Sequence, residues 1–208
     1  LATASTEHMR ITSAGNVGIG TTLPDGTLHV KERGVSIATA NGAVTINSID
    51  GDHDETVSIN SGSGAVSVGR IGGINNSGEG IKSVSITSTH ATGITLSGNI
   101  TTSDKASNDV TFTGKVVISG DVDIDTQSAG QDGDITFSST IKGAGGTDDL
   151  ILDTGTGAIV FNANTVIGGD NTPLDTLTIN SSSSNVALTI PQIGTGTDAG
   201  VTGQVDIG

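Results

Sequence analysis

The chain has 208 residues, 32 of them glycine, with no cysteine, tryptophan or tyrosine and only three phenylalanines. So few aromatic side chains exclude a deep globular core, and the lack of cysteine excludes disulfides as the source of stability. The formal net charge is −14, and the eight Lys and Arg residues form no basic cluster, so we expect no nucleic-acid binding. No run of 18 apolar residues occurs, so we expect no membrane insertion.

A short unit of two apolar residues separated by one residue, usually Ser or Thr, recurs along the whole chain. The outer residues of the unit share one face of a strand, because side chains alternate along a strand. Gly, Asn and Asp stand between the units as turn residues, and no stretch shows a helical period. In chain order the units are residues 17–19, 28–30, 35–37, 44–46, 57–59, 66–68, 84–86, 94–96, 110–112, 116–118, 122–124, 135–137, 150–152, 159–161, 177–179 and 186–188.

Many very short strands with turns of variable length predict an all-β fold. We expect an elongated β-solenoid, similar to a parallel β-helix, in which each coil contributes two or three strands to parallel sheets. Because no repeat of fixed length is visible, a β-sandwich is the alternative. In either fold the outer residues of a unit, such as Val57, Ile59, Ile159 and Phe161, are predicted to be buried, whereas Ser58 and Val160 face outward or into a neighbour.

The N-terminal stretch has a distinctive amino-acid sequence. Residues 9–22 read Met-Arg-Ile-Thr-Ser-Ala-Gly-Asn-Val-Gly-Ile-Gly-Thr-Thr, and Pro24 and Leu28-His29-Val30 follow. This stretch closely resembles a segment common in bacteriophage tail-fibre proteins and related fibrous proteins. The resemblance implies a shaft or connector without catalysis. We therefore divide the chain into a fibre-like connector segment, residues 1–34, and a β-solenoid body, residues 35–208.

The second half of the chain carries another resemblance. Residues 133–137, 150–161 and 173–180 combine short apolar strands with Asp-, Thr- and Gly-rich turns. From about Asp109 onward the chain resembles the β-strand-repeat regions of very large bacterial surface proteins and filamentous-haemagglutinin-like adhesins. That resemblance implies parallel β-helical coils in an elongated extracellular protein.

Two acidic groups are candidate metal ligands. Hard cations such as Ca²⁺ take six to eight oxygen ligands, and acidic, Gly-rich turns can supply them. The alternative is a solvated acidic surface that keeps the protein soluble. No other cofactor is expected. The candidate calcium ligands are Asp50, Asp52, Asp54 and Glu55 in one loop, and Asp121, Asp123 and Asp125, which alternate with apolar residues along one strand face.

The two ends of the chain are candidate assembly sites. Both keep a strand-compatible pattern and lack proline, and strand edges left without a partner template pairing with another chain. Each end is therefore predicted to dock on a neighbouring copy of the chain. The residues in question are Leu1, Ala2, Thr3 and Ala4 at the start, and Val201, Val205 and Ile207 at the end.

These patterns favour a structural role over catalysis. None of His8, His29, His53 and His90 stands in a recognisable nucleophile arrangement, so we expect no enzyme. The sequence predicts a structural subunit of an extracellular or cell-surface fibre whose partners are copies of itself. The alternative is a module of an adhesin or of a phage tail fibre that binds a glycan or a host cell surface. In the case of a phage tail fibre, the protein would be located on the virion tail.

Overall fold

The computed structural model describes residues 9–15, 17–19, 28–30, 34–51, 54–73, 80–103, 106–127, 132–163, 165–169, 172–181, 192–194 and 200–208. These residues contain strands and turns but no helix, as expected from their Gly and β-branched content. The strands are β1 (Met9–Ile11), β2 (Val17–Ile19), β3 (Leu28–Val30), β4 (Val35–Ala38), β5 (Val44–Ile49), β6 (Glu55–Asn60), β7 (Val66–Ile71), β8 (Ile81–Thr87), β9 (Ile94–Leu96), β10 (Ile100–Thr101), β11 (Val110–Thr113), β12 (Val116–Ile118), β13 (Val122–Asp125), β14 (Ile135–Phe137), β15 (Ile141–Gly143), β16 (Leu150–Gly155), β17 (Ile159–Phe161), β18 (Val166–Ile167), β19 (Leu177–Ser181), β20 (Gln192–Ile193) and β21 (Val205–Ile207).

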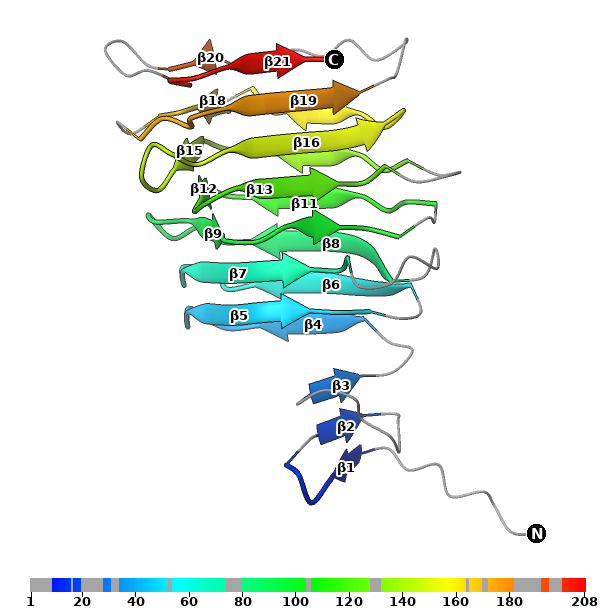
Figure 1. Ribbon diagram of the computed structural model, residues 1–208. Coiled ribbons are helices and arrows are strands. Elements are labelled where there is room, and N and C mark those ends of the chain that lie inside the picture. The colour runs from blue at the N-terminus through cyan, green and yellow to red at the C-terminus, as the bar shows by residue number, and fades with distance from the viewer. Residues whose placement is uncertain are drawn as a thin grey trace, which may run out of the picture.

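From β4 onward the strands wind into a β-solenoid of about five turns, stacked along one axis (Figure 1). The solenoid predicted from the sequence is therefore confirmed. One face is a six-stranded parallel sheet in the order β17-β14-β11-β8-β6-β4. The successive residues in one column of this sheet are separated by 22, 27, 26, 25 and 24 positions, in the order Val35, Val57, Val84, Val110, Ile135 and Ile159.

The second sheet of the solenoid divides into two ladders at β7. Its first residues pair with β9, and its last residue, Ile71, pairs with Ile100 of β10. Below this point β5 and β7 are continuous six-residue strands, and above it each coil bends between two separate strands of this sheet, such as β9 and β10. Gly98 sits at the bend, where a Cβ atom would lie 2.8 Å from the Arg70 nitrogen of the coil below. The cross-section thus changes from two strands per coil to three.

The core consists of columns of like residues stacked coil upon coil. In β6 the burial alternates strictly, with Val57 and Ile59 buried and Ser58 exposed. Parallel in-register pairing places each apolar residue directly on its counterpart one coil away. The buried apolar residues form one continuous cluster that runs from Val44 to Ile179. Aliphatic side chains therefore fill a thin core, as the composition predicts.

A ladder of three stacked phenylalanines occupies one of these columns. The ring centroids of Phe112 and Phe137 are 5.2 Å apart, and those of Phe137 and Phe161 are 5.8 Å apart. Phe112 and Phe137 are fully buried. Phe161 is half-buried, and β17 pairs only with β14 among the described strands. The sequence prediction of a buried residue holds for Ile59 and Ile159 but overstates the burial of Phe161.

Strands β1 to β3 form a separate small sheet beyond the N-terminal end of the solenoid (Figure 1). β1 pairs antiparallel with β2, and β2 pairs parallel with β3. Gly15 allows the hairpin turn, because its φ of 85° lies in the left-handed region and its N–H donates to the Thr12 carbonyl. Pairing within the solenoid begins with Val35 of β4.

The position of each phenylalanine in the ladder predicts how much it stabilises the fold. Replacing Phe137 by Ala removes a ring packed between two others and should lower the free energy of unfolding by about 3–5 kcal/mol. Phe161→Ala should cost clearly less, because that ring is half-buried. Denaturant unfolding followed by circular dichroism would measure both. An equal loss in the two variants would contradict the proposed ladder.

Candidate functional site

An acidic strip lies on the outer face of β13. Val122 and Ile124 point into the core, so Asp123 and Asp125 point outward, and Asp125 lies beside Asp153 in the register with β16. Burial raises the pKa of the Asp123 carboxyl, and the charges of Asp125 and Asp153 raise it further. The shared outward face predicted for Asp123 and Asp125 is confirmed.

Asp125 has a similar environment. Burial raises its pKa, and the nearby charges of Asp153 and Asp132 also raise it, although a hydrogen bond from the Gln127 N–H opposes them. Asp121 stands apart from the strip, because it lies exposed in the corner before β13 begins. The strip therefore consists of carboxylates that repel one another at neutral pH.

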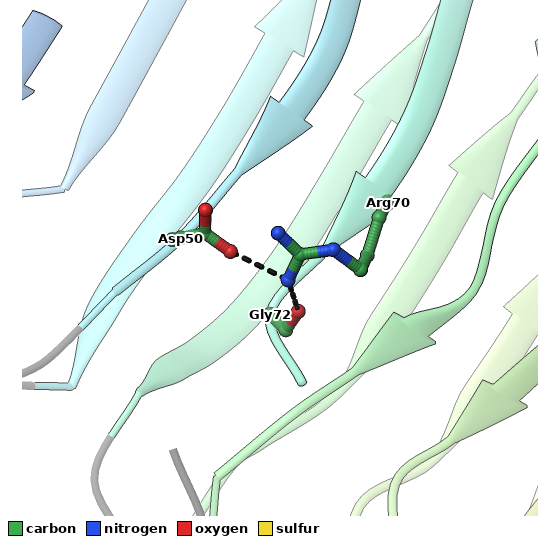
Figure 2. A network of polar contacts seen from close by, with 3 residues as sticks. All are labelled: Asp50, Arg70 and Gly72. Carbon is green, nitrogen blue, oxygen red and sulfur yellow. Dashed lines mark hydrogen bonds and ion pairs between the residues drawn. The ribbon is translucent and has the colours of Figure 1, made fainter. Parts of the chain in front are cut away.

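The first predicted calcium group is divided between different environments. Asp50 forms an ion pair with Arg70 of the next coil, with 2.6 Å between Nη1 and Oδ1, and the same nitrogen donates to the Gly72 carbonyl at 2.5 Å (Figure 2). Glu55 is buried at the start of β6, next to Asp54 in the preceding turn. Each carboxylate thus has a distinct local setting.

Metal binding by these groups stays a prediction of the sequence. Asp52 lies outside the described residues. In the part of the chain that the structure describes, no group of three or more His, Cys, Asp or Glu side chains has a geometry that could hold a metal ion. The same part contains no helix long and apolar enough to cross a membrane.

Many of the other acidic and amide side chains form hydrogen bonds between neighbouring coils. At the corners, where the backbone ladder is interrupted, a side-chain oxygen accepts the N–H of the residue one coil above. Asp134 takes part in two such contacts. Its N–H donates to the Asp109 carboxylate at 2.9 Å, and its own carboxylate accepts the Ala158 N–H at 2.7 Å. The same contact joins Asn41 to Ser63, Asn99 to Asp123, Asp132 to Thr156 and Asp149 to Thr176.

Asp148 is the most buried of these corner carboxylates, with 5% of its surface exposed. It accepts the Gly120 N–H of the coil below and the Gly145 N–H of its own corner, both at 2.7 Å. Burial by itself raises the pKa of Asp148, but these N–H groups, with those of Ala144 and Gly146, outweigh it and hold the pKa below the usual value. Asp148 therefore fastens two coils together as a charged acceptor.

Two strands at sheet edges, β21 and β1, expose apolar residues. β21 continues the core columns, since Val205 lies on Leu177 and Ile207 on Ile179, yet Val205 is 41% and Ile207 52% exposed. Val201 differs from these two residues, because it forms a bridge with Leu174 and packs against the core. Of the three residues predicted for C-terminal assembly, the two exposed apolar ones thus lie in β21.

At the other end the exposed apolar residues lie in β1. Met9 is 60% and Ile11 is 64% exposed. The sequence prediction placed the N-terminal assembly site at Leu1 to Ala4, which lie outside the described residues. Met9-Arg10-Ile11 repeats the apolar-x-apolar unit with a charged middle residue, and this pattern would have identified β1 as a strand.

His90 has a structural contact in a turn. Its Nδ1 atom lies 2.7 Å from the Thr92 hydroxyl and accepts the Thr92 N–H. His29 is the middle residue of β3, and His8 and His53 lie outside the described residues.

Comparison with known proteins adds no relative: no family model, no curated protein and no solved structure matches the chain.

The two kinds of carboxylate predict opposite effects of an amide substitution. Asp123→Asn should raise stability at pH 7. The folded pKa of Asp123 is raised, so its contribution to stability is present below the ordinary value of 3.8 and is lost as the pH rises through the folded pKa. At pH 7 the ionised carboxylate therefore destabilises the fold, and a neutral amide removes that charge. Asp148→Asn should lower stability at pH 7 by about 1–3 kcal/mol, because a buried acceptor of N–H bonds is weakened.

The pH dependence separates the two cases. The contribution of Asp148 is present above 3.8 and is lost as the pH falls through its lowered folded pKa. Both differences from wild type should therefore shrink on acidification, and they should shrink from opposite signs. Unfolding curves from pH 3 to pH 8 would measure this, and changes of the same sign at pH 7 would contradict the assignment.

Proposed function

We propose that this chain is a structural segment of an extracellular or cell-surface fibre, in which copies join through strand edges at the ends of the stack. The observation that carries the proposal is the exposure of Val205 and Ile207 on a strand that continues the core columns. Within the described residues β21 pairs with β19 on one side only. A further coil of β-structure placed there would bury both residues and satisfy the backbone edge.

Three further features support this function. The strands of the solenoid are stacked along one axis (Figure 1). Residues 9–30 resemble tail-fibre segments, and the second half resembles adhesin repeats. The net charge of −14 keeps parallel rods apart in solution, because like charges on their sides repel, and this favours joining by the ends.

Glycan binding receives less support from the side chains. Sugar rings commonly stack on exposed aromatic residues, and the chain has only three aromatic residues. Phe112 and Phe137 are fully buried in the core, and Phe161 stacks on Phe137. A structural role is therefore the function that the geometry favours.

Charged substitutions at the end of the stack test the proposal. Wild-type protein should form end-joined filaments that lengthen with concentration in negative-stain microscopy and sedimentation velocity. Val205→Lys with Ile207→Lys should abolish them without changing strand content, because charge blocks an edge strand. The matched control is Ile151→Lys with Ser85→Lys, since both side chains are exposed on the sides of the solenoid and their strands, β16 and β8, have a partner strand on each side.

Each outcome has a distinct meaning. Filaments that survive the control but not the β21 variant support joining by the ends. Loss of filaments only in the side variant would show lateral association instead. Isolated short rods at every wild-type concentration would contradict self-association altogether.

A further inference from the structure

Strands β1 and β21, each at an edge of its sheet in the described part of the chain, match each other. β1 reads Met-Arg-Ile and β21 reads Val-Asp-Ile, so each has three residues with apolar side chains at the first and third positions. All six residues are exposed in the single chain. Each strand pairs on one side only among the described strands, β1 with β2 and β21 with β19. Within the described residues, each strand therefore has one edge without a partner strand, and such an edge can accept another strand.

We propose that β1 of one copy adds to the free edge of β21 of the next copy, so that the copies join head to tail. This inference rests on the proposed fibre function and identifies the joint. In such a pair the apolar residues Met9 and Ile11 cover Val205 and Ile207. The middle residues Arg10 and Asp206 lie opposite each other whether the strands run parallel or antiparallel, because they are central in three-residue strands.

Charge selects this pairing over the two symmetric ones. Opposite charges facing each other across a strand pair are favourable, and like charges there are unfavourable. Pairing β21 with another β21 would place Asp206 against Asp206, and pairing β1 with another β1 would place Arg10 against Arg10. The head-to-tail pair alone brings Arg10 to Asp206. A head-to-tail contact of this kind joins two different surfaces, so it does not end at a two-fold dimer, and it generates an open filament when the rotation between copies does not close a ring.

The register of the solenoid supports the geometry. β21 lies on β19 in the same parallel register that joins earlier coils, with Val205 on Leu177 and Ile207 on Ile179. A strand added to its free edge continues an existing ladder and covers the exposed end of the core. The joint is short, and thus the association should depend on concentration and on salt.

A charge exchange tests this joint. Arg10→Glu alone, or Asp206→Arg alone, replaces an opposite-charge pair by a like-charge pair and should weaken end-to-end association about tenfold. The double variant, Arg10→Glu with Asp206→Arg, should restore it. An equimolar mixture of the two single variants should also assemble, because each end of one variant then meets an end of opposite charge on the other.

Controls and salt make the readout specific. Lys82→Glu and Asp121→Arg make the same charge changes away from both ends, on the side of β8 and in an exposed corner, and should leave association unchanged. Added salt should weaken wild-type filaments and strengthen those of the single variants, since it screens attraction in the first case and repulsion in the second. Sedimentation velocity would measure the degree of association of each variant, of the mixture and of the controls at low and high salt.

The outcomes separate the joint from the function. Rescue by the double variant and by the mixture would establish the β1–β21 joint. If wild type forms filaments and both single variants form them equally well, the joint is wrong and the fibre function stands. If wild type remains monomeric at all concentrations, both proposals are wrong.

Discussion

The structure depends on the stacking of each residue on its counterpart in the neighbouring coil. Parallel strands in register place Val84 on Val57 and Val110 on Val84, so that an apolar residue of one coil always meets an apolar residue of the next. A shift of one residue would turn a whole column from the core to the surface. Register is thus the constraint that lets small aliphatic residues and a few stacked phenylalanines suffice for a core.

The same stacking explains where the acidic and amide residues lie. At the corners the backbone ladder is interrupted, and N–H groups there need another acceptor. Asp109, Asp132, Asp134 and Asp149 each supply a side-chain oxygen to the residue stacked one coil above. Part of the negative charge therefore belongs to the fold. The strip around Asp123 and Asp125 is different, because burial and mutual repulsion disfavour the charged form of its carboxylates and raise their pKa values.

Much of the fold could be predicted from the sequence, because each unit alternates along the strand with a period of two residues. Each of the units at 57–59, 84–86 and 110–112 lies in a strand of the six-stranded sheet. The coil length could not be read in the same way, because turns absorb the differences. The corner between β12 and β13 spans Ser119–Asp121, whereas the one between β15 and β16 spans Ala144–Asp149.

The candidate site was less predictable for a physical reason. Sequence shows that Asp134 and Asp148 are acidic turn residues, but only the stacking of one coil on another shows which N–H each accepts. In the same way, the exposure of Met9 and Ile207 follows from the position of their strands at sheet edges in the described part of the chain. An apolar-x-apolar unit in the middle of the stack has the same pattern and is buried, as Val57 and Ile59 are.

The central claim is the in-register parallel stack, and paired cysteines test it most directly because the chain has none of its own. Ser85 lies on the outer face of β8, directly beside Thr111 of β11, 26 positions later. Adjacent strands lie about 4.8 Å apart, within the range of a disulfide. Ser85→Cys with Thr111→Cys should cross-link rapidly in mild oxidant without loss of strand content. Ser85→Cys with Thr136→Cys, two coils apart, should not. Equal cross-linking of the two pairs, or none in the first, would contradict the stack described here.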